Sequence, residues 1–328
     1  MENPLVSVVA LNWNGKDHIE ECLDTLFKQT YKNYEVIVVD NGSEDGSNLT
    51  IKNKFPKAKL IENKKNLGFC KANNQGIRIS KGKYIITLNN DTKLDKDWLK
   101  ELVKVAEENP EAGMLSCKML FYDKPSYINS KGLKLYHDAK AVDDGFNEPE
   151  LDSENEKVME VFGPCGGAAF FSRELINDIS LDGQFYDEDF FIYSDDLDVS
   201  FRARWRGWKC LYVPKAKLLH KFQGTTRKIS NFGLYYGIKN KMFFIIKNYP
   251  LTFLIKHSPV ILSRQLVSFL YYLIKLNPAA FKSRMMILYK MPLMLRKRWK
   301  IQRSRKVPSI ELKKWLIPRP IKDSLFSN

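Results

Sequence analysis

The sequence has no uninterrupted apolar run of the ~20 residues that a membrane-spanning helix requires. In the C-terminal quarter, where apolar residues are frequent, Lys247, Lys256, Arg264 and Lys275 interrupt them. The N-terminal segment MENPLVSVVALNWNG has no basic stretch before its short apolar run, and polar residues follow that run at once. This segment therefore predicts a β-strand rather than a signal peptide, and we expect a cytoplasmic protein.

Cysteine is scarce, and no two cysteines form a C-x-x-C pair or lie at metal-ligand spacing from a histidine. This spacing excludes a zinc-ribbon site and does not indicate a disulfide framework. We expect reduced and mostly buried thiols, as is usual in the cytosol. The five cysteines are Cys22, Cys70, Cys117, Cys165 and Cys210.

Two common phosphate-binding motifs are also missing. The first apolar run is not followed by G-x-G-x-x-G, and no G-x-x-x-x-G-K-[ST] occurs anywhere in the chain. Both motifs bring a glycine-rich backbone against a phosphate group. Their absence argues against a dinucleotide-binding enzyme and against a P-loop nucleotidase.

Acidic residues are nearly absent from residues 239–328, which carry 20 Lys and Arg against only Glu311 and Asp323. The net charge of +15 belongs to this region, because the upstream residues have 33 bases and 36 acids. Basic amphipathic helices with aromatic residues are typical of the membrane interface, and the segment 296–306 adds a polybasic patch worth ~1 kcal/mol per charge near anionic lipid. We expect an anionic membrane surface as a partner, with an ordinary basic-faced helical subdomain as the alternative. No recognised nucleic-acid motif accompanies the charge, so nucleic acid is not an expected partner.

The first ninety residues alternate short β-branched runs with longer amphipathic stretches. The runs at 5–11, 34–40, 58–63 and 84–88 predict strands, and helices are expected at about 17–27, after residue 43 and at 69–80. Nearly continuous Val and Ile strands are what a sheet covered on both faces requires. The sequence therefore predicts an α/β fold with an open sheet.

Polar residues follow each of these four strands. In parallel sheets, ligands bind beyond the carboxyl ends of the strands. Polar residues at all four strand ends therefore indicate a ligand-binding site rather than four ordinary turns. Asp40 could accept hydrogen bonds from a ribose or a base, and Asp91 could hold a divalent cation on a diphosphate. The polar ends are Asn12 to Gly15, Asp40 to Ser43, Asn63 with Asn66 to Gly68, and Asn89 to Asp91.

A second region, 163–220, also contains residues suited to catalysis. Asp195 and Asp196 follow an aromatic segment that would desolvate them, and a desolvated carboxylate beside apolar surface can serve as a general base. The alternative is that both acids only favour the N-terminus of a helix. Asp198 and Arg202 are four residues apart and are expected to pair across one helical turn. His220 alone would more often be a structural residue than a metal ligand.

The ordered series of motifs in residues 4 to 240 strongly resembles the family 2 inverting glycosyltransferases of GT-A fold, most of all their rhamnosyltransferase-like branch. That resemblance implies a mixed sheet flanked by helices. The motifs are VVALNWNG, YEVIVVDNGSEDGS, NLGFCKANNQGI, GKYIITLNNDT, DGQFYDEDFFIYSDD and FRARWRGW, followed by His220.

The resemblance also implies roles for individual residues. Asp196 would be the catalytic base, with Asp195 as the other member of the acidic pair. Asp91 and His220 would hold Mg²⁺ or Mn²⁺, although amides replace the first two positions of the family's D-x-D. The residues that would bind the nucleotide sugar are Leu11, Asn12, Asn14, Asp40, Asn66, Gly68, Asn73, Asn90 and Asp91, with Asn73 standing where many members have Arg.

The expected activity is transfer of a sugar, rhamnose among the candidates, from a dTDP- or UDP-sugar with inversion. The acceptor would be a saccharide or a polyprenyl-linked saccharide in cell-surface polysaccharide synthesis, at the cytoplasmic face of the membrane. We expect a catalytic domain at 1–238 and a basic helical region at 239–328. The alternatives are a nucleotidyltransferase and a nucleotide-sugar-binding protein whose site has been weakened by the amides at 89 and 90.

Overall fold

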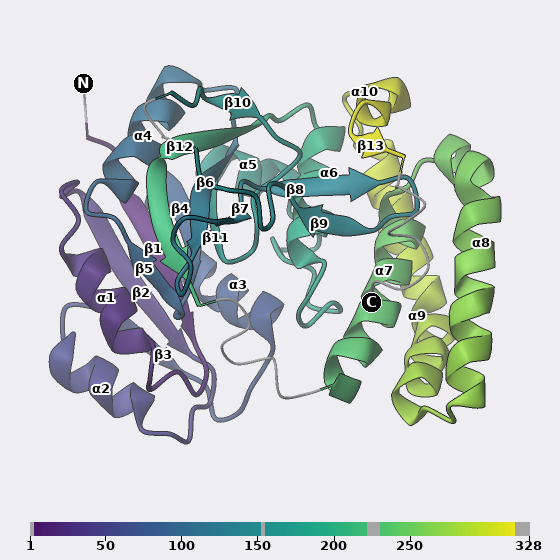
Figure 1. Ribbon diagram of the computed structural model, residues 1–328, viewed down its shortest axis with the longest axis horizontal. Coiled ribbons are helices and arrows are strands. Elements are labelled where there is room, and N and C mark those ends of the chain that lie inside the picture. The colour runs from purple at the N-terminus through teal and green to yellow at the C-terminus, as the bar shows by residue number, and fades with distance from the viewer. Residues whose placement is uncertain (1–2, 152–154, 222–229, 319–328) are drawn as a thin grey trace.

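The computed structural model describes residues 3–151, 155–221 and 230–318 (Figure 1). Its first ninety residues alternate strands and helices as the sequence predicts, with each strand boundary within one residue of the expected one. The elements are β1 (Val6–Asn12), α1 (Ile19–Phe27), β2 (Tyr34–Asp40), α2 (Ser47–Lys54), β3 (Lys59–Glu62), α3 (Phe69–Ile79) and β4 (Tyr84–Asn89).

The following segment completes the sheet and adds a small hairpin. Its elements are β5 (Thr92–Leu94), α4 (Trp98–Glu108), β6 (Met114–Phe121), β7 (Ile128–Ser130), β8 (Leu133–Tyr136), β9 (Ala141–Asp143), β10 (Met159–Glu160), β11 (Ala168–Ser172), α5 (Arg173–Ile179), α6 (Asp195–Trp205) and β12 (Cys210–His220).

The main sheet is mixed. In the described part of the chain its strand order is β10-β12-β6-β11-β4-β1-β2-β3, with β5 paired to β12 and β7 paired to β6. Strands β1 to β4 run parallel, whereas β11 lies antiparallel between β4 and β6. The carboxyl ends of β1, β2, β3 and β4 therefore meet at one edge, as the sequence indicates. The predicted mixed sheet flanked by helices is confirmed.

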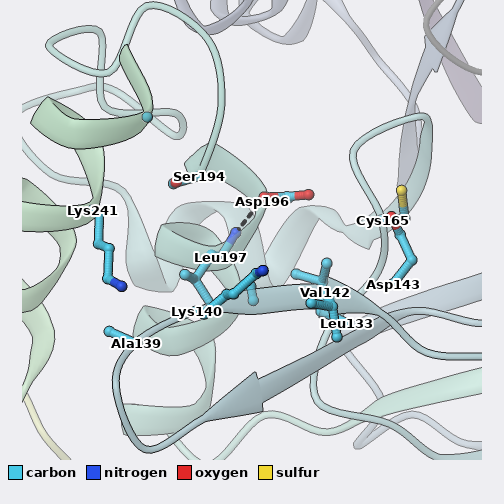
Figure 2. A pocket seen from close by; sticks show the side chains of 12 residues that line it. Leu133, Ala139, Lys140, Val142, Asp143, Cys165, Ser194, Asp196, Leu197 and Lys241 are labelled. Atoms are coloured by element: carbon cyan, nitrogen blue, oxygen red, sulfur yellow. Dashed lines mark hydrogen bonds between the residues drawn. The ribbon is translucent and has the colours of Figure 1, made fainter. Parts of the chain in front are cut away.

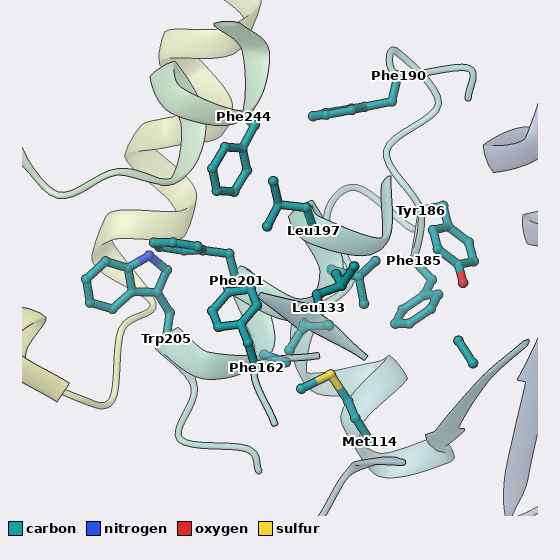
Figure 3. Close-up of a cluster of buried hydrophobic side chains, with 14 of the residues drawn as sticks. Met114, Leu133, Phe162, Phe185, Tyr186, Phe190, Leu197, Phe201, Trp205 and Phe244 are labelled. Carbon is teal, nitrogen blue, oxygen red and sulfur yellow. The ribbon is translucent and has the colours of Figure 1, made fainter. Parts of the chain in front are cut away.

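Alternation of side chains along each strand divides the interior into two cores. On β1, Val8 and Ala10 pack with helices α1, α2 and α4, while Val9 faces the core that contains α3, α5 and α6. The second core is rich in aromatic rings, and Figure 3 shows Phe162, Phe201, Trp205 and Phe244 gathered around α6. Because this core continues into the C-terminal helices, α6 is held between the sheet and those helices.

The C-terminal elements are α7 (Ser230–Asn248), α8 (Leu251–Ile274), α9 (Pro278–Arg303), α10 (Ser309–Lys313) and β13 (Leu316–Ile317). Helices α7 and α9 lie beside the part of the chain that forms the sheets, and α8 lies on the outer side (Figure 1). Strand β13 pairs with β8 in a small second sheet. The boundary expected at 238 falls inside α7, and side chains of α7 and α9 belong to the same core as β-strand residues. Among the described helices, none combines the length and apolarity needed to cross a membrane.

Candidate active site

The carboxyl ends of β2, β1 and β4 are joined by a chain of side-chain hydrogen bonds. Asn12 donates from Nδ2 to Oδ2 of Asp40 at 2.7 Å, and its Oδ1 accepts from Nδ2 of Asn90 at 2.8 Å. All three side chains are buried. Asp40 also accepts from the backbone N–H and the hydroxyl of Ser43. The side-chain amides of Asn12 and Asn90 therefore order this edge of the sheet.

The other residues expected at the nucleotide lie around the same edge or on α3. Asn14 is exposed, has a φ of 48° and accepts from Glu44 N–H. Asn66 Oδ1 accepts from Asn41 and from Gly68 N–H. Gly68 has a φ of 85°, and a methyl group there would lie 2.5 Å from the Phe191 ring, so only glycine fits.

Leu11 and Asn73 occupy less open positions. Leu11 is partly buried next to the aromatic core. Asn73 is fully buried on α3, where its Nδ2 donates to the Phe69 carbonyl. Its Oδ1 has no hydrogen-bond partner among the described residues. Lys71, two residues before Asn73 on α3, is half exposed and lies 3.8 Å from Glu188.

The two residues expected to hold a metal ion lie side by side. Nε2 of His220 is 3.3 Å from Oδ1 of Asp91, and both side chains are largely buried. Nδ1 of His220 lies 2.8 Å from Oδ1 of Asn129. A protonated Nδ1 that donates to this amide directs the Nε2 lone pair toward Asp91, which is the arrangement of a metal-ligating histidine.

The Asp91–His220 pair fits a divalent cation whose other ligands come from a bound diphosphate and water. Oδ1 of Asp91 is buried and has no hydrogen-bond partner in the part of the chain that the structure describes, which is costly unless another group satisfies it. One carboxylate and one imidazole suit Mn²⁺, while Mg²⁺ prefers oxygen ligands. The described residues contain no group of three or more His, Cys, Asp or Glu side chains arranged for a metal. The remaining ligands would therefore have to come from a diphosphate and from water.

Asp196 lies close to this pair, across two consecutive glycines. Its Oδ2 accepts from Gly166 N–H at 3.1 Å and its Oδ1 from Leu197 N–H at 2.7 Å. A methyl group at Gly167 would lie 3.6 Å from Nε2 of His220. The adjacent glycines thus let the carboxylate and the imidazole approach the same backbone segment.

Burial gives Asp196 the properties of a general base. Burial, with the neighbouring Asp143 carboxyl, raises its pKa to about 6 against the opposing effect of the Leu197 N–H bond. The carboxylate borders a cavity of about 290 Å³ (Figure 2). A carboxylate with a pKa near neutrality, oriented by two N–H groups and open to a cavity, can take a proton from a bound hydroxyl.

The neighbouring acids of α6 have different surroundings. Asp195 is buried, and both burial and the adjacent Asp196 raise its pKa well above the usual range. Asp198 pairs with Arg202 at 3.0 Å, as the sequence predicts, and also with Lys247 at 2.9 Å. Asp198 therefore ties α6 to α7.

The loop before α6 is held by residues from the C-terminal helices. Three of its non-glycine residues, Phe191, Tyr193 and Ser194, have positive φ angles, which are strained for such side chains. Nδ2 of Asn240, on α7, lies within hydrogen-bond distance of the carbonyls of Phe190, Ile192 and Tyr193, at 3.0, 2.7 and 2.8 Å. The fully buried Asn240 side chain stabilises the conformation that leads into Asp195 and Asp196.

Buried ion pairs hold the start of the same loop. Lys297 of α9 lies 2.5 Å from Asp187 and 2.6 Å from Asp189, and Lys247 of α7 also contacts Asp187. These cations lower the pKa of Asp187. Breaking one partner of such a buried pair is strongly destabilising, so the C-terminal helices contribute to the architecture of the site.

Several of these residues carry no signal in the sequence. Asn129 lies in a short strand, and Asn240 lies in the region expected to be a separate module. Lys140, Asp143 and Lys241 border the cavity beside Asp196 only because the β8–β9 hairpin and α7 converge there. A family-wide record of which positions vary together is the kind of signal that would have found them.

Comparison with known sequences identifies the family. The sequence model described as glycosyl transferase family 2 matches residues 7–180. A glycosyltransferase of Haemophilus influenzae is 38% identical over 113 residues, which are 33% of this chain and 35% of that protein. The N-acetylglucosaminyl-diphospho-decaprenol L-rhamnosyltransferase of Mycobacterium tuberculosis is 24% identical over 241 residues, 66% of this chain and 76% of that one. The chain spans only 35 to 41% of the length of the first curated relatives that it matches.

Solved structures confirm the GT-A fold. A mannosyltransferase of Pyrobaculum calidifontis, in complex with GDP-Man and Mn²⁺, aligns with a TM-score of 0.54 at 17% identity, covering 96% of this chain and 79% of the other. GalNAc-T7 with UDP, GalNAc and Mn²⁺ aligns with a TM-score of 0.57 at 18% identity, covering 74% and 48%. At these identities the likeness concerns the fold alone.

Proposed function

We propose that the chain, which belongs to glycosyl transferase family 2, is a glycosyltransferase that moves a sugar from a nucleotide diphosphate sugar to an acceptor hydroxyl with inversion. One observation carries this proposal above the others: the Asp196 carboxylate borders a cavity and lies across Gly166 and Gly167 from the Asp91–His220 pair. An inverting displacement requires a base and a diphosphate site close enough to act on opposite faces of one anomeric carbon. Family membership supports sugar transfer over the nucleotidyltransferase alternative.

In the proposed reaction, an acceptor hydroxyl attacks the anomeric carbon from the face opposite the diphosphate. Asp196 takes the hydroxyl proton as the new C–O bond forms, and the nucleoside diphosphate leaves with the electron pair of the broken bond. The two N–H groups of Gly166 and Leu197 keep the carboxylate in one orientation. Correct positioning of the base contributes roughly 10² to 10⁴ in rate.

The donor would lie along the carboxyl ends of β1, β2 and β4. The ordered chain Asp40–Asn12–Asn90 gives this edge preset hydrogen-bonding groups for a base and a ribose. Asp91 and His220 would hold Mn²⁺ or Mg²⁺, which supplies electrostatic stabilisation of the charge on the departing diphosphate when bound. With a single carboxylate in the pair, we expect little metal affinity without the nucleotide.

The acceptor is proposed to be a lipid-linked saccharide at the cytoplasmic face of a membrane, and rhamnose is one candidate for the transferred sugar. The mycobacterial relative is named as a rhamnosyltransferase that acts on a diphospho-decaprenol acceptor. Helix α8 buries only Phe253, His257 and Ile261, and its exposed apolar side chains include Leu266, Leu273 and Ile274. A large exposed apolar face beside many cations suits an anionic membrane interface.

The proposal is tested by incubating the full chain with UDP-, dTDP- and GDP-sugars in the presence of Mn²⁺ or Mg²⁺. In the absence of acceptor, water is expected to hydrolyse the donor slowly. The measured product is the nucleoside diphosphate, whose release should depend on the metal. Proton NMR during the reaction should show the inverted anomer first. Release of a retained anomer would contradict the inverting mechanism, and no release with any donor would favour the binding-protein alternative.

A further inference from the structure

Helix α8 is attached to the rest of the protein by a narrow stripe of side chains. The structure describes all 24 of its residues, and of these only Phe253, His257 and Ile261 are buried. They are spaced four apart and therefore lie on one face of the helix. The middle position of this otherwise apolar stripe is a histidine that is only 9% exposed. Histidine is the side chain whose ordinary pKa places its charge change between pH 5 and 8, so the attachment of α8 has a titratable group at its centre.

The partner of His257 is a second histidine. The β8–β9 hairpin reaches toward the C-terminal helices (Figure 1), and His137 lies in its turn. The centroids of the two imidazole rings are 4.8 Å apart, and the ring planes are tilted by 32°. Nε2 of His137 also lies 2.8 Å from the carbonyl oxygen of Leu316 in β13, and because a carbonyl only accepts, this nitrogen carries a proton. The hairpin, β13 and α8 therefore meet at the two rings.

One acid lies at the same turn, and cations face it. The buried carboxylate of Asp138 contacts the guanidinium of Arg264 on α8 and lies 3.7 Å from Nζ of Lys241 on α7. Burial, together with Asp138, raises the pKa of Tyr249, directly after α7, so this phenol stays neutral. Asp138 is thus already engaged by two cations. Its ion pair with Arg264 is a second tie between α8 and the hairpin.

Protonation opposes the contact between the two rings. Burial lowers the pKa of His257, and the neighbouring His137 and Lys256 act in the same direction. The packed state therefore binds fewer protons than a state in which α8 has moved away and His257 has its ordinary pKa of ~6.5. By linkage, the packing is most stable above that pH and weakens as pH falls through it. Two charged rings at this separation would also repel each other.

We propose that His137 and His257 form a pH-sensitive clasp that packs α8 against the β8–β9 hairpin at neutral pH and releases it on protonation. The clasp joins two parts of the surface. The hairpin contributes Val142 and Asp143 to the wall of the cavity beside Asp196, and α8 carries an exposed apolar face. Release of α8 would loosen that wall and free the helix together. The clasp is a property of the fold and does not depend on the proposed function.

Hydrogen exchange of the full chain measures the release of α8. After correction for the intrinsic pH dependence of exchange, the opening of α8 should increase up to about tenfold from pH 7.5 to pH 5.5, while β1 and β4 keep their protection. His257→Phe keeps a ring in the stripe but cannot be protonated, so it should remove this increase. His18→Asn, at the start of α1, is the matched control and should keep it. Equal protection of wild-type α8 at both pH values, or a wild-type response in His257→Phe, would overturn the clasp.

NMR titration tests the contact between the rings even if His257→Phe folds poorly. The chain has four histidines, so selective labelling of histidine gives four ring signals that substitution can assign. We expect His257 to titrate below the ordinary value of ~6.5 and to move toward that value in His137→Phe, which removes the neighbouring charge. His18→Asn should leave the midpoint of His257 unchanged. A midpoint that is ordinary in the wild type, or that His137→Phe does not move, would contradict the proposal.

Discussion

Nε2 of His220, at the end of β12, lies 3.3 Å from Oδ1 of Asp91, which follows β4. Strand β5, which begins directly after Asp91, is paired with the end of β12, so backbone hydrogen bonds bring these two distant residues together. This pair, with a carboxylate oxygen that has no hydrogen-bond partner among the described residues, is the basis of the metal site that we propose.

Removal of either side chain should abolish metal-dependent donor binding. Asp91→Ala and His220→Ala are expected to bind UDP equally with and without Mn²⁺, whereas the wild type should bind it more tightly with Mn²⁺. Asn129→Ala, which removes the partner of the imidazole, should weaken metal-dependent binding by roughly 10- to 100-fold. Calorimetric titration of UDP measures all three, with the exposed Asp24→Asn as the control. An unchanged response to Mn²⁺ in Asp91→Ala would contradict the assignment.

The activity should depend on pH through Asp196. Its pKa is raised to about 6, so the base form is lost as pH falls through that value. The transfer rate should fall roughly tenfold between pH 7 and pH 5, because only about a tenth of the carboxyl groups remain ionised at pH 5. The measurement is kcat across this range with saturating donor and metal. A rate that stays constant down to pH 5 would contradict a raised pKa of the catalytic carboxyl.

Asn240 should affect turnover through the loop that precedes Asp195. Asn240→Ala removes the amide that faces three loop carbonyls, and a small displacement of a catalytic group can cost on the order of 10²-fold in rate. We expect a lower kcat with little change in the KM for the donor, because the donor edge lies on other strands. Asn231→Ala, at an exposed position of the same helix, is the control. A kcat equal to that of the control would show that Asn240 does not position the catalytic acids through this loop.

The exposed face of α8 should bind anionic vesicles. Leu266→Asp and Ile274→Asp should each reduce binding to phosphatidylglycerol vesicles by tenfold or more, since burial of one such side chain contributes about 1.5 to 3 kcal/mol. Leu49→Asp on α2 is a matched control, because Leu49 and Leu266 are each 56% exposed. Co-sedimentation of the full chain measures the effect. Equal binding by all variants and the wild type would leave α8 as a solvent-exposed helix.

The sequence predicted the central strands and the edge where polar residues meet, because β-branched runs and polar strand ends are local patterns. It also placed Asp198 against Arg202, since a four-residue spacing fixes neighbours on a helix. It did not predict that Asn90 would bond to Asn12, although this bond explains the amides before Asp91. That contact depends on the order of β1 and β4 in the sheet, which no local pattern encodes.

The domain boundary expected at residue 238 lies within α7, which is one continuous helix in the structure. The change in composition near that point is real, but it reflects the exposed side of the C-terminal helices. Their inner side carries Asn240, Lys247 and Lys297, which hold the loop before α6. Polar residues that become buried through tertiary packing look like surface residues in a sequence, so their contribution to the site could not be predicted.

The central claim is that Asp196 takes the proton of the attacking hydroxyl. The most direct test compares the transfer or donor-hydrolysis rate of the wild type with that of Asp196→Asn at pH 7, after calorimetry has shown equal donor binding by both. The account predicts a rate lower by roughly 10² to 10⁴ in the variant, with the dissociation constant for the donor unchanged. A rate near that of the wild type, with intact donor binding, would contradict it.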